Sequence, residues 1–279
     1  MNDWKQKLHF SQSLNEHIIS FAVFRTNTSY FRWNEARSAW GKTINHSRNI
    51  MRQASSWTLR DEKVRQFMSD EELEKLLSEI ALNIWSVPRA MTRHLLSPGE
   101  DEYFFQKEVR ETLPPGDAES LIVARHRPQR ALYQLSKSVA KLPLDFRQRM
   151  IIDESLTVLI DMIGTCERLF SAPIPLFYTR HTARFLSAWL LLLPFALYEP
   201  FKDTWNHVGM IPAAAVMSFF FFGVEELAVQ LEEPFSILPM AQMTQGIGLS
   251  AREMADWHEE EKDVPAQQTQ PWNQNTWRR

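Results

Sequence analysis

Two long apolar runs stand next to each other in the second half of the chain. They are FLSAWLLLLPFALY at 185–198 and GMIPAAAVMSFFFFGV at 209–224, and a short polar connector joins them. A membrane-spanning helix needs about 20 apolar residues, and shorter runs are more often buried core helices. Four consecutive phenylalanines at 219–222 leave the second run without a polar face. This favours a membrane hairpin, with a buried hairpin of a soluble protein as the alternative.

The composition predicts an all-α protein. Only 8 of the 279 residues are glycine, and 44% are hydrophobic. The chain lacks the long alternating Val, Ile and Thr runs that are typical of strands. A formal net charge of −3 disfavours nucleic acid as a partner. The single cysteine, Cys166, excludes both a disulfide framework and a cysteine-based zinc site.

Helix-starting and loop-forming residues along the chain predict a series of helices. One long helix is expected over 11–58, and another follows the acidic start Ser69–Glu72. Shorter helices are expected over roughly 101–112, 117–125 and 129–141, and a long one over 145–170. The residues after 251 are polar and poor in aliphatic side chains, so we predict a disordered tail over 251–279, with His258 in a solvated acidic run.

No pattern for catalysis is present. The eight histidines show no spacing typical of a helical metal site, and there is no phosphate-binding loop or nucleophile elbow. The pairs Glu225-Glu226 and Glu232-Glu233 are seven residues apart and share a helix face. They could be catalytic acids or metal ligands, but a solvated acidic stripe is the favoured interpretation. We therefore predict no enzyme activity, no cofactor and no metal.

Three stretches together carry a family resemblance. The first is VFRTNTSY at 23–30, followed by RWNEAR at 32–37 and Trp40-Gly41. The second, APIPLFYTRH at 172–181, leads into the first apolar run. The third, GVEELAVQLEEPFSILP at 223–239, follows the second run. In this order they resemble the bestrophin family of pentameric anion channels, in its plastid and bacterial-like branch.

The resemblance implies a bestrophin-like subunit of a homopentamer that conducts chloride, bicarbonate or both through one axial pore. The match of the third stretch to thylakoid members implies a multi-pass protein of the chloroplast thylakoid membrane, in contact with lipid. A helical membrane scaffold that does not conduct, or a truncated subunit, is the alternative function. A soluble all-helical interaction protein is a third possibility, disfavoured by the phenylalanine run.

The resemblance also assigns the pore residues. Phe24 is expected at the narrow neck, with Ser20 one turn earlier on the same face. Thr26, Asn27 and Thr28 would form the polar flank of the neck. Ile174, positioned by Pro175, would form a second constriction. An apolar ring of five Phe24 side chains would gate by dewetting, and its ring edges would favour anions.

Each of these residues also has a simpler interpretation. A phenylalanine on a helix, or an isoleucine before a proline, usually packs in a core. Arg25, Arg32 and Arg37 are expected to form salt bridges between helices, or headgroup contacts, in preference to ion contacts.

The chain departs from the family pattern in three places. Residues 1–16 cannot supply the expected first membrane helix, which suggests a truncated or atypical chain, and Glu16 stands where an apolar neck residue is expected. Residues 236–240 carry no carboxylate, so calcium gating there is not expected. The predicted organisation is an atypical N-terminus over 1–16, a channel domain over 17–250 and the tail over 251–279. Within the channel domain we expect a pore helix at 17–58, extramembrane helices at 69–170 and a membrane hairpin at 182–230.

Overall fold

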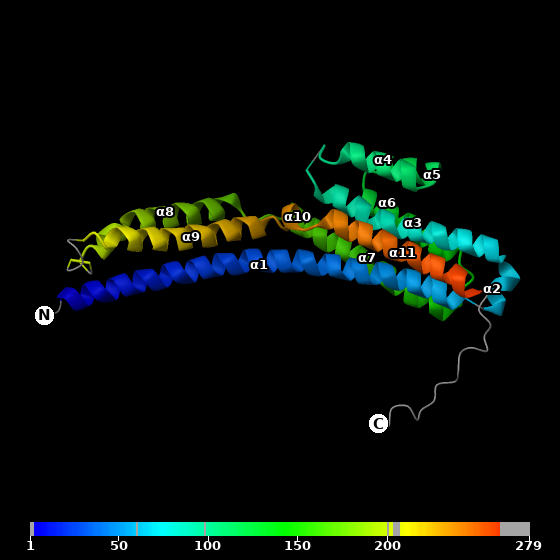
Figure 1. Ribbon diagram of the computed structural model, residues 1–279, viewed down its shortest axis with the longest axis horizontal. Coiled ribbons are helices and arrows are strands. Elements are labelled where there is room, and N and C mark those ends of the chain that lie inside the picture. The colour runs from blue at the N-terminus through cyan, green and yellow to red at the C-terminus, as the bar shows by residue number, and fades with distance from the viewer. Residues whose placement is uncertain (1–2, 60, 98, 200, 203–206, 263–279) are drawn as a thin grey trace, which may run out of the picture. The chain divides into compact units, whose positions relative to one another are not determined.

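The computed structural model describes residues 3–59, 61–97, 99–199, 201–202 and 207–262, with the side chains of 3–19, 21–22 and 62–63 left out. These residues form eleven α helices (Figure 1), which confirms the all-α prediction. The chain divides into two compact units. One contains Met1–Ser38 and Glu167–Leu238, and the other contains Ala39–Cys166 and Pro239–Arg279.

The first unit is built around a helical hairpin. It contains the N-terminal part of α1 (Asp3–Thr58), the last turn of α7 (Phe146–Ser171), α8 (Leu176–Leu197), α9 (Met210–Glu232) and the short α10 (Pro234–Ile237). In Figure 1, α8 and α9 run side by side. Leu186, Leu190 and Leu193 of α8 form a small core on which Phe221 of α9 packs, and the Trp189 and Phe221 rings meet edge to face at 5.3 Å.

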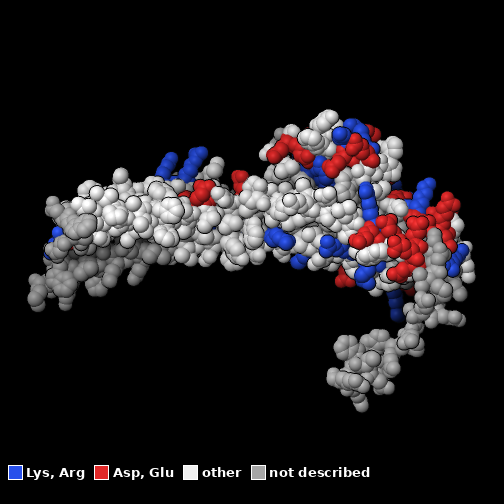
Figure 2. Space-filling model, viewed as in Figure 1, with Lys and Arg blue, Asp and Glu red and all other residues white. Residues whose placement is uncertain are grey.

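The outer surface of this hairpin is apolar and uncovered. Within the described part of the chain, α9 is the one helix long and apolar enough to cross a membrane, and none of its apolar window is buried. The basic residues Arg180 and Arg184 lower the apolarity of α8. Even so, α8 exposes Leu191, Leu192 and Phe195, and the face seen in Figure 2 shows few charges over both helices. An apolar patch of this extent indicates a lipid or protein contact.

The second unit packs around α3 (Asp70–Leu95), which lies against α6 (Arg127–Ala140) and α11 (Met240–Lys262). It also contains α2 (Glu62–Phe67), α4 (Glu102–Thr112), α5 (Pro115–Val123) and the adjoining parts of α1 and α7. Helix α3 begins as the sequence predicts. The Ser69 side chain accepts from the Glu72 amide, and the Glu72 carboxylate accepts from the Ser69 amide, which is a complete capping box.

The C-terminal prediction is wrong over 251–262. Helix α11 continues to Lys262, so disorder does not begin at 251, and residues 263–279 lie outside the described residues. His258 is only 5% exposed, with Nε2 3.4 Å from the Thr58 hydroxyl of α1. The buried face of α11 packs against other helices of its unit, and local composition does not reveal such contacts.

Helix α1 also begins earlier than the predicted start at residue 11. It is continuous from Asp3 to Thr58, and none of the residues before Gly41 is a glycine or proline that would end it. The Glu16 side chain, where an apolar neck residue was expected, lies outside the described residues.

Candidate functional site

The part of α1 in the first unit has two sharply different faces. Phe24 is 61% exposed, whereas the next residue, Arg25, is 3% exposed. Successive residues on an α helix are about 100° apart, so a single step crosses from an open face to a buried one. The candidate site is this helix segment with the groups that hold it.

The open face of α1 carries most of the predicted pore residues. Ser20, Phe24, Asn27 and Phe31 are exposed, and Thr28 is partly exposed. Their spacing of three and four residues places them on one stripe along the helix. We call this set the Phe24 stripe. Nothing in the described chain covers it, so an apolar ring and several polar groups remain available to a partner surface or to solvent.

Two members of the predicted polar flank differ from the expectation in detail. The Thr28 hydroxyl donates to the Phe24 carbonyl at 2.9 Å, so its hydrogen is engaged by the helix backbone. Thr26 lies two residues from Phe24, about 160° around the helix, and is partly buried. Thr26 therefore lies outside the Phe24 stripe, while Asn27 lies on it.

The buried face of α1 is held by charge. Nη1 of Arg25 donates to the Thr182 hydroxyl of α8 at 2.8 Å and also to the Glu225 carboxylate of α9. Nη2 of Arg25 lies 4.0 Å from Oε2 of Glu232. A buried guanidinium needs such partners, because an unpaired charge away from water is costly. One side chain thus connects α1 to both helices of the hairpin.

Arg32 makes a second attachment seven residues further along the same face. Its guanidinium donates to three backbone carbonyls, those of Leu169 at 2.7 Å, Ala172 at 2.9 Å and Glu232 at 3.2 Å. These carbonyls lie at or just beyond the C-terminal ends of α7 and α9, where helix carbonyls lack intrahelical partners. Arg25 therefore forms the predicted salt bridge between helices, whereas Arg32 connects helices through backbone carbonyls.

The favoured interpretation of the acidic pairs is wrong for two of the four residues. Glu225 and Glu232 are 18% and 14% exposed and face Arg25, so they are not solvated. Glu226 and Glu233 are exposed, as the stripe interpretation requires. A spacing of seven places carboxylates on one face, but it cannot show that an arginine 200 residues away lies opposite that face.

The predicted second constriction lies in the turn between α7 and α8. Ile174 is partly buried, and Pro175 is the N-cap residue of α8, where its carbonyl accepts from the Tyr178 amide at 2.9 Å. Proline fixes its own backbone and favours an extended conformation in the residue before it. Ile174 is therefore held at the entrance to α8 by the residue that was expected to position it.

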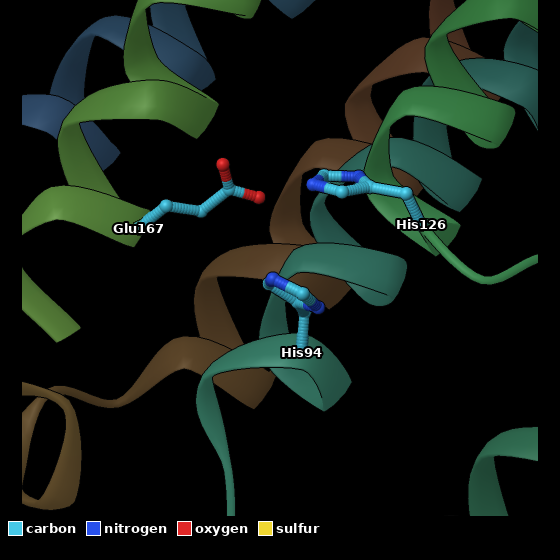
Figure 3. A group of neighbouring side chains, drawn as sticks. All are labelled: His94, His126 and Glu167. Atoms are coloured by element: carbon cyan, nitrogen blue, oxygen red, sulfur yellow. The ribbon is translucent and has the colours of Figure 1, made fainter. Parts of the chain in front are cut away.

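Two histidines that sequence spacing could not pair meet in the second unit. His94 near the end of α3 and His126 at the start of α6 have ring centroids 5.1 Å apart (Figure 3). Imidazole nitrogens are common zinc ligands, and candidate ligand atoms of the two rings lie within 4.8 Å of each other. Two imidazoles supply two of the four ligands that a tetrahedral zinc site needs.

The fold and its uncovered apolar surfaces define an all-helical membrane protein. Residues 13–253 match the family described as "Bacterial/Fungal Bestrophin protein". The chain belongs to the bestrophin family. This agrees with the prediction that it is not an enzyme, since the curated relatives below are named as channels.

Curated relatives include channels of plants and bacteria. The chain is 31% identical over 222 residues to voltage-dependent chloride channel 1, chloroplastic, of Arabidopsis thaliana, covering 79% of this chain and 50% of the relative. It is 30% identical over 221 residues to a voltage-dependent anion channel-forming protein of a Nostoc species, covering 78% and 66%. The chain spans about half the length of the chloroplast relatives it matches.

Solved structures show the same fold. A point variant of a bacterial bestrophin homologue from Klebsiella pneumoniae superimposes with a TM-score of 0.74 at 23% identity. The match covers 88% of this chain and 86% of the homologue. This likeness confirms the predicted helical architecture.

Proposed function

We propose that the chain is a subunit of a homopentameric anion channel in which the Phe24 stripe lines the pore. The observation that carries the proposal is the contrast between the two faces of α1. The buried face is held by Arg25 and Arg32, while Phe24 is exposed on the other. A stripe that combines phenylalanine with Ser20 and Asn27 fits a narrow, mostly dry passage better than a lipid contact, because polar side chains are costly in hydrocarbon.

In this function Phe24 forms the neck and Ser20 the turn before it. Thr26, Asn27 and Thr28 flank the neck, with Asn27 the best placed to face the ion. Ile174 and Pro175 form the second constriction. Phenylalanine ring edges carry partial positive charge and attract an anion that has lost part of its hydration. Chloride and bicarbonate are the proposed ions, and the chloroplast relatives support a plastid membrane, proposed here as the thylakoid.

Anion flux from liposomes tests this function. The purified chain is reconstituted, and chloride efflux is compared between the wild type, Phe24→Ala and Ile174→Ala. We expect both changes to alter conductance or the preference for chloride over larger anions, since each removes five apolar side chains from a constriction. Phe220→Ala, at an exposed position of α9, is the control and should leave flux unchanged.

Two results would contradict the proposal. An assembled wild-type protein that releases no anion would favour the non-conducting scaffold. A conducting protein whose selectivity and conductance are the same in both variants would remove Phe24 and Ile174 from the pore.

A further inference from the structure

The guanidinium of Arg25 is buried in the first unit and contacts both helices of the hairpin. It has one hydrogen bond to α8, through Thr182, and one to α9, through Glu225. Glu232 provides a second carboxylate at 4.0 Å and is itself held by the Thr179 hydroxyl, which donates to it at 3.3 Å. The Thr182 hydroxyl in turn donates to the Thr179 carbonyl at 2.7 Å, so Thr182 and Glu232 are each held by a further contact.

Such a network is a poor source of stability in itself. Desolvation of a buried ion pair offsets much of its Coulomb attraction, and apolar residues of similar size often replace it without loss. What a buried pair does supply in well-attested cases is registry, because sliding or turning one helix would strand a charge. The Arg25 network has the geometry for that role, since its members come from three helices.

Because Arg25 is next to Phe24 in the sequence, a network that fixes Arg25 also fixes the direction of the Phe24 side chain. Phe24 precedes Arg25 directly, so the angle between the two side chains is fixed by the helix. Arg32, seven residues on, attaches the same face to the carbonyls of Leu169, Ala172 and Glu232. Two attachments on one face restrain both rotation of α1 about its axis and movement along it.

We propose that the Arg25–Glu225 pair is a positioning device that fixes the rotation of α1 and keeps Phe24 on the open face. The consequence for the pore rests on the proposed function, but the rotation itself does not. Arg25 is a positioning residue in this account, because its side chain is buried and points away from the Phe24 stripe.

Thiol labelling tests the rotation without relying on conduction. Single cysteines are placed at Phe24 and at Ser29, which is fully buried, in a Cys166→Ala background. Labelling by a water-soluble maleimide is compared in the otherwise unchanged protein and in Arg25→Met/Glu225→Met. We expect position 24 to react more than about tenfold faster in the unchanged protein, and the ratio to fall to about threefold or less in the double variant.

A matched control and a second variant keep the test decisive. Arg37→Met/Glu226→Met makes the same substitutions at exposed positions of α1 and α9 and should keep the original ratio. Arg25→Lys retains the charge but not the planar fork, whose Nη1 contacts Thr182 and Glu225 while Nη2 lies 4.0 Å from Glu232, so it should also lower the ratio. Arg25→Lys takes the place of Arg25→Met/Glu225→Met in the labelling test if that double variant does not fold.

The outcomes are distinct from failure of the proposed function. An unchanged labelling ratio in the variants would overturn the positioning role, and so would failure of both variants to fold, which would show a plain requirement for stability. Absence of anion flux in the unchanged protein would instead contradict the channel while leaving the labelling result in force.

Discussion

Glu102 of α4 shows how one carboxylate can connect several helices of the second unit. It accepts from both terminal nitrogens of Arg127 at 2.8 and 2.9 Å, from Gln106 at 2.8 Å and from Nε of Arg93 at 2.7 Å. These donors lower the pKa of Glu102 to about 2, with Arg127 the largest cause, while burial acts in the opposite direction. Arg93 and Arg127 are the neighbours in sequence of His94 and His126, so the same carboxylate fixes the helix ends that bring the two imidazoles together.

The pKa of Glu102 predicts a specific acid sensitivity. Its folded pKa of about 2 is below the ordinary value of 4.5, so its stabilising effect is present above 4.5 and is lost as the pH falls through about 2. We expect Glu102→Gln to lower the melting temperature at pH 7 and to flatten its dependence on pH between about 4.5 and 2. Thermal melts in detergent across that range measure this.

The control for Glu102 is another carboxylate of the same helix. Glu111 is exposed, and Glu111→Gln should keep the wild-type profile. If Glu102→Gln and the wild type lose stability in parallel as the pH falls, Glu102 does not provide the acid-sensitive contact.

The packing of α11 on α3 depends on a glycine. A Cβ at Gly248 would lie 2.7 Å from Cδ1 of Trp85, closer than real side chains approach. Gly246, two residues earlier on the same helix, has open space where its Cβ would be. Alanine at Gly248 therefore tests the close contact with Trp85, whereas alanine at Gly246 tests only the loss of backbone flexibility. Both glycines lie in α11.

We predict opposite effects from the same substitution at these two positions. Gly248→Ala should lower the free energy of unfolding by about 1–3 kcal/mol, because the Trp85 ring has to move. Gly246→Ala should raise it by about 0.5–1 kcal/mol, because alanine favours the helix. Melting temperatures of the two variants in detergent provide the comparison, and a stabilised Gly248→Ala would contradict the observed packing.

Local signals predicted the elements well and the contacts between them poorly. The capping box at Ser69 is complete within four residues, so the start of α3 can be found from the sequence. The burial of Glu225 depends on Arg25, 200 residues away, and that of His258 depends on Thr58. The same limit applies to the candidate site, where the sequence predicted a salt bridge between helices for Arg25 but not its partners, Thr182 and Glu225.

The whole molecule presents two kinds of surface that a monomer in water would not keep exposed. One is the outer face of α8 and α9, including Leu191, Phe195 and Phe219, and the other is the Phe24 stripe. The first fits lipid, since large apolar side chains such as these are exposed on both helices. The second mixes phenylalanine with Ser20 and Asn27, and we propose that copies of it meet around the pore.

Thiol block of anion current tests the proposed pore most directly. Phe24→Cys and Phe220→Cys, each in the Cys166→Ala background, are reconstituted in planar bilayers and treated with a negatively charged thiol reagent. The account predicts that chloride current falls sharply for Phe24→Cys, because fixed negative charge in a narrow apolar ring repels anions. Current through Phe220→Cys should persist. An unchanged current after complete modification at position 24 would contradict the placement of Phe24 in the anion path.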